Sequence, residues 1–136
     1  MPDQQTDLSA SLAALPIVDW DLALDRSLDD EEFLKETLAL FRESAREQLE
    51  AIARAISGSA PDTLREVAHS LKGSSATVGA DRFSAVAKEL ERMGREKDLT
   101  HAPVVLQLLR DEAKTAFGLM DEFVAGRISV RHPAAR

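Results

Sequence analysis

Apolar residues recur with helical spacing through most of this chain. Four long segments place them at i, i+3, i+4 and i+7, which is the pattern of a helix with one buried face. The pattern predicts long helices over residues 29–58, 61–78, 81–95 and 103–126. No segment alternates apolar and polar positions with a period of two, so we expect no β-sheet. In the first long helix the predicted apolar stripe consists of Phe33, Leu34, Leu38, Phe41, Ala45, Leu49, Ile52 and Ile56.

Residues that favour helix ends separate these segments. Asp29 and Glu32 are three positions apart, as in a capping box, and predict the start of the first long helix. Asp81 is placed to cap the third long helix. The other boundaries carry residues typical of helix starts and stops, namely Gly58, Pro61, Gly79, Pro103 and Gly126.

Two segments with a weaker helical pattern of apolar residues precede the four long ones. They predict short helices over 7–15 and 17–26, the second anchored by Trp20 and Leu24. The connections between the long helices are short, which implies antiparallel neighbours. The predicted fold class is all-α: an antiparallel, up-down four-helix bundle with one or two short N-terminal cap helices.

We expect three parts along the chain. Residues 17–126 form the bundle domain, and residues 1–16 form an N-terminal segment that is partly helical or flexible. Residues 127–136 carry three arginines and no acid and form a basic, frayed tail.

The amino-acid composition of the chain excludes several classes of function. Hydrophobic residues make up 44% of the 136 residues and charged residues 30%, as in a globular protein. No apolar run approaches the roughly 18 residues of a membrane span, and the first residues are not those of a signal peptide. The chain has no cysteine, so it has no disulfide or thiolate metal site, and we expect a cytoplasmic location. The net charge of −7 argues against a general nucleic-acid surface, so we expect neither a nucleic-acid nor a membrane partner.

His69 is the candidate for chemistry. It lies roughly 150° around its predicted helix from the middle of the apolar stripe, and Lys72 follows one turn later on the flank. Gly73 follows at i+4, where an ordinary side chain would cover the surface above His69. Because a glycine inside a helix costs about 1 kcal/mol relative to alanine, its presence needs a reason, and here it leaves the imidazole open. An exposed imidazole with a lysine one turn away can accept and hold a phosphoryl group.

Each of these residues also has an ordinary interpretation. His69 can be a plain surface residue, Lys72 a solvated charge, and Gly73 a packing notch or a weak point in the helix. The order and spacing of the three favour the chemical interpretation.

Three successive segments resemble the histidine-containing phosphotransfer (HPt) domain family. They are the segment His69–Ala76, the segment Val78–Ala80 and a helix ending in residues 90–95. The upstream segments Asp19–Leu24 and 33–41 are similar to the first helices of that family. The resemblance extends from residue 17 to residue 124.

The resemblance implies a phosphoryl carrier in a multistep phosphorelay, with His69 as the phosphoacceptor. The receiver domain of a hybrid sensor histidine kinase would hand the phosphoryl group to His69, which would pass it to the receiver domain of a response regulator. In this family the magnesium ion belongs to the receiver partner, so we expect no cofactor and no metal site on this chain. We expect a monomer that docks through a small apolar patch around the His69 helix and the N-terminal helix.

Five residues are candidates for stabilising the phosphate or shaping the site. Lys72 can bring positive charge to His69 through its i+3 spacing, beside the open Gly73. Ser74 can offer a hydroxyl group to the phosphate. The resemblance places Arg95 beside the phosphoryl group, although an i, i+4 surface pair with Glu91 is an equal alternative. Glu91 stands where several family members carry glutamine; a carboxylate can accept a hydrogen bond from an imidazole N–H but repels a phosphate.

Two other function classes remain open. One is a helical module that binds receiver domains without transfer, and the other is a receiver phosphatase with no phosphohistidine intermediate. The chain has no nucleotide-binding glycine-rich loop, so we expect no autokinase activity. His101 and His132 lack metal-ligand spacing. The start at Met1 and the lack of a kinase core favour a free-standing protein, although an excised domain would look the same.

Overall fold

The computed structural model describes residues 4–130, with side chains from residue 8 onward. Within that range the chain forms helices and no strand. The helices are α1 (Gln4–Ala13), α2 (Trp20–Arg26), α3 (Glu31–Ser57), α4 (Pro61–Thr77), α5 (Asp81–Glu96) and α6 (Ala102–Val124). Within the described residues, no helix combines the length and the apolar character needed to cross a membrane.

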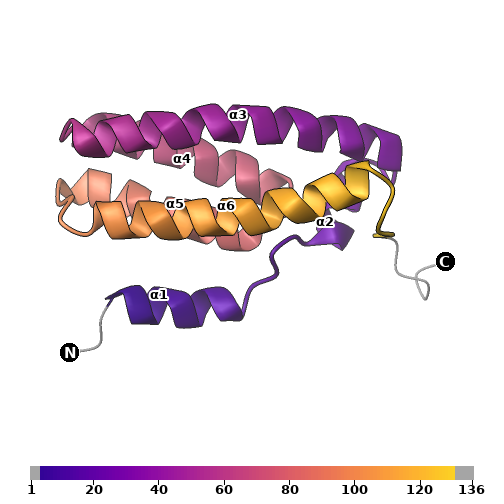
Figure 1. Cartoon of the computed structure of the whole chain (residues 1–136), viewed down its shortest axis with the longest axis horizontal. Helices are drawn as coiled ribbons and strands as arrows, with labels where there is room; N and C mark the ends of the chain where they lie inside the picture. The colour runs from indigo at the N-terminus through magenta and orange to yellow at the C-terminus, as the bar shows by residue number, and fades with distance from the viewer. Residues whose placement is uncertain (1–3, 131–136) are drawn as a thin grey trace.

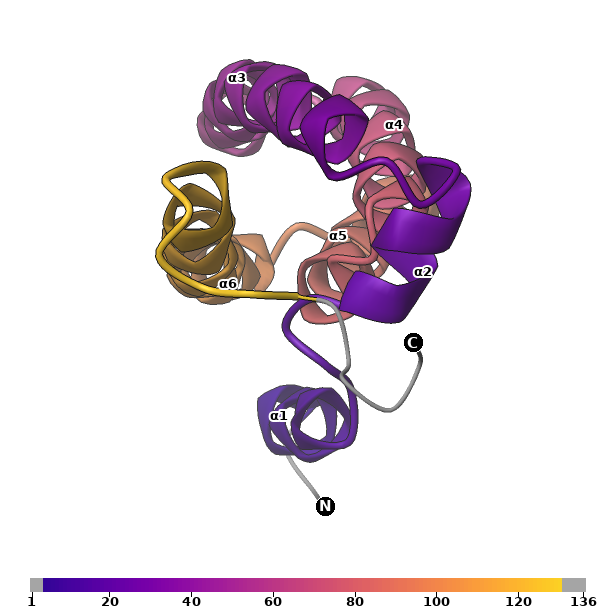
Figure 2. The same cartoon turned by 90° about the vertical axis from the view of Figure 1, so that its right-hand side faces the viewer.

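The four long helices α3, α4, α5 and α6 form the bundle, with their axes running roughly along the long axis of the molecule (Figure 1). Viewed along that axis, they surround a common centre, and α6 lies across the bundle from α4 (Figure 2). The short helix α2 packs against α3, and α1 lies outside the bundle against α5 (Figure 2). The predicted all-α four-helix bundle with one or two short N-terminal helices is confirmed, and two such helices, α1 and α2, are present.

The start of α3 differs from its prediction. Asp30 is the cap, because its Oδ1 accepts hydrogen bonds from the backbone N–H groups of Glu32 and Phe33 at 3.0 and 3.1 Å. Leu28 and Asp29 adopt left-handed φ angles of 55° and 61°. A capping residue needs an extended backbone, so Asp29 cannot act as the cap, and the predicted capping box is wrong by one residue.

The predicted cap of α5 is also wrong. Ala80 occupies the cap position without a side-chain hydrogen bond, and Asp81 is the first residue of the helix. In α2 the cap is Asp19, whose Oδ1 accepts from the N–H of Leu22 at 3.1 Å, so this helix begins at Trp20 and not at residue 17.

The core lies between the inward faces of the four long helices. Edge-on and tilted ring contacts join Phe41, Phe83 and Phe117 across three helices, with ring centroids 6.1 to 6.3 Å apart. Phe33 departs from the predicted stripe: it is 54% exposed, because its neighbour Leu34 and the residues in register with it already face the core.

The chain after α6 returns to the bundle. Gly126 ends the helix with a φ of 77°, as its position predicted. Arg127 donates a hydrogen bond to Glu122 at 2.8 Å, and Val130 is buried against the core. The part of the tail at 127–130 is therefore packed where a frayed end was expected, and residues 131–136, with His132, lie outside the described residues.

Candidate functional site

Helices α4 and α5 approach closely enough for their outer faces to form one surface. Gly94 makes this possible, because a Cβ atom there would lie 2.7 Å from the backbone nitrogen of Arg65 and the backbone oxygen of Pro61. At the other end of the pair, the Ser84 hydroxyl donates to the carbonyl oxygen of Lys72 at 2.9 Å. These contacts set the register in which α5 lies beside the exposed face of α4.

His69 occupies the middle of that surface. Its side chain is 68% exposed, which agrees with its predicted position opposite the apolar stripe. Its Nδ1 lies 3.2 Å from Glu91 Oε1 and 3.3 Å from Glu91 Oε2. A carboxylate accepts but does not donate, so this geometry favours the tautomer with the proton on Nδ1. The other ring nitrogen, Nε2, is left with its lone pair available for attack.

Glu91 is the buried member of the site, with a side chain only 11% exposed. Lys72 Nζ lies 2.8 Å from Glu91 Oε2, and Arg95 lies farther out, with 3.9 Å between its guanidinium nitrogen and Glu91 Oε1. Burial alone would raise the pKa of the Glu91 carboxyl, but hydrogen bonds from Lys72 and His69 outweigh it, so that the pKa is lowered. Glu91 is therefore a buried carboxylate held by two neighbours.

Gly73 leaves open space beside His69. A Cβ atom at this position would meet nothing within 4 Å, whereas the one at Gly94 would meet backbone. Gly73 is consequently not a packing notch, and within the described structure no neighbour requires it.

The structure brings together three of the predicted site residues, His69, Lys72 and Glu91, with Arg95 at the edge. It does not bring Ser74 to the imidazole: five positions correspond to about 140° around a helix, and its hydroxyl donates to the carbonyl oxygen of Leu71 at 3.2 Å. The alternative Glu91–Arg95 surface pair is also weak, since the two side chains are 3.9 Å apart.

The burial of Glu91 was not predicted from the sequence, where this residue was considered as a surface partner of Arg95 and as the counterpart of a glutamine in the family. A signal for it exists in Ala87 and Gly94, small residues that flank Glu91 at −4 and +3 and lie buried in the structure. Small side chains on one face let two helices approach, and a residue beside that face is then covered by the neighbouring helix.

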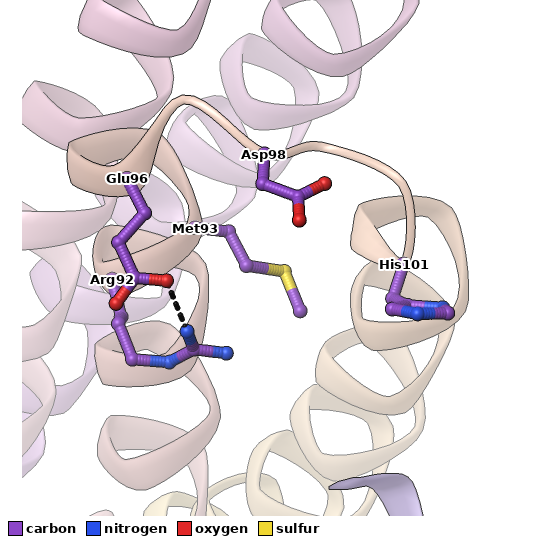
Figure 3. Close-up of a pocket in the computed structure, with 5 residues that line it drawn as sticks. All are labelled: Arg92, Met93, Glu96, Asp98 and His101. Carbon is purple, nitrogen blue, oxygen red and sulfur yellow. Dashed lines mark hydrogen bonds and ion pairs between the residues drawn. The ribbon is translucent and has the colours of Figure 1, made fainter.

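A hollow of about 170 Å³ lies at the turn between α5 and α6, away from His69 (Figure 3). Figure 3 shows Met93 extending from α5 toward His101 across this space. The charged residues that line the hollow interact with their neighbours. Arg92 forms an ion pair with Glu96, and Asp98 accepts two hydrogen bonds from Thr100, which lower the pKa of the Asp98 carboxyl. His101 lacks the buried carboxylate that holds His69, and no group of three potential metal ligands occurs in the described part of the chain.

The exposed large hydrophobic residues do not form the predicted docking patch. Among residues 8–130 they are Leu28, Phe33, Leu40, Val104 and Val124. They lie before and along α3 and on α6, and none belongs to α4 or α1. The surface around His69 is instead polar and charged.

Comparison with known families bears directly on this site. The family model described as Hpt domain matches residues 36–117, which include His69, Lys72 and Glu91. The chain belongs to the Hpt domain family. The family predicted from the sequence is thereby confirmed, and no curated protein matches this Hpt chain.

Solved structures support the same fold. This Hpt chain is similar to histidine-containing phosphotransfer protein B (HptB) from Pseudomonas aeruginosa PAO1, with 25% identity and a TM-score of 0.77 over 81% of this chain and 96% of that one. Its fold is also similar to the HPT domain of a sensor hybrid histidine kinase from Shewanella, with 20% identity and a TM-score of 0.70 over 81% of this chain and 95% of that one.

Proposed function

We propose that this Hpt domain is a phosphoryl carrier in a multistep phosphorelay, with Nε2 of His69 as the acceptor atom. The observation that carries the proposal is the pairing of an exposed imidazole with a buried carboxylate at Nδ1. The carboxylate orients the ring and leaves Nε2 as the nucleophile facing solvent, where a protein donor can reach it.

The transfer step balances without a further reactant. The Nε2 lone pair attacks phosphorus of an aspartyl phosphate, the N–P bond forms, and the P–O bond to the aspartate breaks. The aspartate leaves as a carboxylate. The proton on Nδ1 stays between the ring and Glu91, whose negative charge stabilises the positive charge that develops on the imidazole.

The phosphorylated state needs positive charge near Nε2. Lys72 is 30% exposed and lies on the flank of His69 one turn away, so its ammonium group can turn from Glu91 toward a phosphoryl group. Arg95 is 59% exposed and is held only loosely, so its guanidinium group can do the same. We assign both residues to phosphate stabilisation.

The donor in this proposal is the receiver domain of a hybrid sensor histidine kinase, and the acceptor is the receiver domain of a response regulator. Magnesium stays with the receiver domains, the carrier has no autokinase activity, and the exchange takes place in the cytoplasm between monomeric carriers and their partners.

The test is transfer of ³²P from phosphorylated receiver domains of hybrid kinases to this protein, beside the variant His69→Gln. We expect acid-labile label on the wild type and none on the variant. Loss of label from the receiver without any labelled carrier would replace the proposal by the phosphatase alternative. Binding of the receiver without movement of label would favour the binding module.

A further inference from the structure

The charges around His69 are divided between its two sides. On the side of α5 lie four cations: Arg65 and Lys72 on α4, and Lys88 and Arg95 on α5. The carboxylate among them, Glu91, is buried and already held by Lys72. The protein as a whole has a net charge of −7, so the charge on this side of His69 is opposite in sign to the net charge of the molecule.

The side of α3 lacks such a cluster of cations. An open groove of about 420 Å³ lies between α3 and α4 beside His69, and its charged lining residues are two glutamates, Glu47 and Glu66, and one arginine, Arg54. A partner that approaches His69 therefore meets a cluster of cations on the side of α5 and a groove of mixed, weakly acidic charge on the side of α3.

Arg65 and Lys88 are the two cations of this surface without a role so far. Both are exposed, and neither forms an ion pair or a side-chain hydrogen bond with any described residue. Arg65 precedes His69 by one turn, or about 6 Å along the helix axis. Lys88 precedes Glu91 by about one turn and is exposed. It lies at the edge of α5 next to α4, because Ser84, one turn earlier still, contacts Lys72.

We infer that Arg65 and Lys88 steer the phosphorylated partner onto His69, and that they act on encounter while Lys72 and Arg95 act on the bound phosphoryl group. The inference rests on the proposed function. The partner it fits is a protein surface that is anionic around its aspartyl phosphate, oriented with that anionic end over α5.

The physical basis is long-range attraction. Arg65 lies about 6 Å from His69 along α4, and Lys88 lies about one turn from Glu91 along α5, and both spacings are shorter than the Debye length of about 10 Å at an ionic strength of 0.1 M. Charges arranged in this way raise association rate constants by about 10- to 1000-fold in favourable cases. Because Arg65 and Lys88 have no internal partner, removing their charge leaves the fold and the chemical step intact.

The experiment compares wild type with the double variant Arg65→Gln/Lys88→Gln, using the same ³²P-labelled receiver domain. The matched control is Arg46→Gln/Lys114→Gln, which removes one arginine and one lysine that are exposed on α3 and α6 and also form no ion pair with described residues. For each protein the second-order rate constant of transfer and the maximal single-turnover rate constant are measured at about 0.02 M and about 0.5 M salt, because screening is strong only at the higher value.

We expect the double variant to lower the second-order rate constant about 3- to 10-fold at low salt, with the difference largely lost at high salt and the maximal rate constant unchanged. The inference is overturned if the double variant transfers as fast as wild type, or if the control variant slows transfer equally. A slower maximal rate constant would overturn it too, because it would place the two residues in the chemical step. If His69 of the wild type never accepts label, the proposed function fails as well, and the two failures are thereby distinguishable.

Discussion

Replacing Gly73 with alanine tests why this residue interrupts α4 beside His69. A glycine inside a helix costs stability, and the structure offers no internal compensation, because a Cβ atom there would meet nothing within 4 Å. Because Gly73 lies one turn from His69, we expect the open space to serve a partner that reaches the imidazole. The substitution should separate stability from function.

The expected gain in stability follows from helix propensity alone. Gly73 lies within α4 and its position is exposed, so an added methyl group neither clashes nor becomes buried. Alanine should raise the free energy of unfolding by about 1 kcal/mol. For a domain of this size that corresponds to a rise in Tm of roughly 3–5 °C.

Transfer should move in the opposite direction. The methyl group would enter the space through which a partner reaches the imidazole, and overpacking at a fitted interface costs about 1–3 kcal/mol. We therefore expect the second-order rate constant for phosphotransfer to fall roughly tenfold. The matched control is Gly118→Ala in α6, where a Cβ atom also meets nothing within 4 Å. It should give the same gain in urea denaturation and unchanged transfer.

Two results would refute this reasoning. Equal transfer by the Gly73→Ala and Gly118→Ala variants would show that the glycine is not needed for access. A Gly73→Ala variant that is less stable than wild type would show that the local helix is not free to accept a side chain.

Three further predictions concern the elements that hold the site. Gly94→Ala should cost about 1–3 kcal/mol in urea denaturation, because its Cβ would lie 2.7 Å from backbone atoms of α4; an unchanged midpoint would mean that the two helices can separate freely. Asp30→Ala should lower stability by about 1 kcal/mol in thermal melts through loss of two capping hydrogen bonds, and an unchanged Tm would contradict the assignment of Asp30 as the cap. The pKa of Glu91 is lowered from its ordinary 4.5 in the folded state, so its ionised form stabilises the protein above that pH and the contribution disappears as the pH falls. The stability difference between wild type and Glu91→Gln should therefore shrink between pH 7 and pH 3, and a difference that grows on acidification would contradict the assignment.

The predicted helix ends show which boundaries the sequence alone predicts correctly and which it does not. Glycines that end helices were located correctly at Gly79 and Gly126, since a left-handed φ strongly favours this residue type. The cap of α3 was missed by one residue because Asp29 and Asp30 are adjacent acids of equal capping propensity. Their backbone conformations differ only because the chain has to turn from α2 into α3.

Sequence alone determined the features that depend on one helix at a time. The period of apolar residues determines the long helices and their buried faces, and the same period places His69 on the exposed face, with Lys72 and Gly73 one turn beyond. Such relations are local, because they follow from 3.6 residues per turn and need no knowledge of the neighbouring helix.

Tertiary structure decided how the site is completed. The close approach of α4 and α5 at Gly94 buries Glu91 and brings its carboxylate to His69 and Lys72, while Ser74 faces elsewhere. The period of α5 predicts which face is apolar, but not the register at which that face meets α4. Register and approach distance arise from packing between residues that are far apart in the chain, and here they decide which carboxylate orients the imidazole.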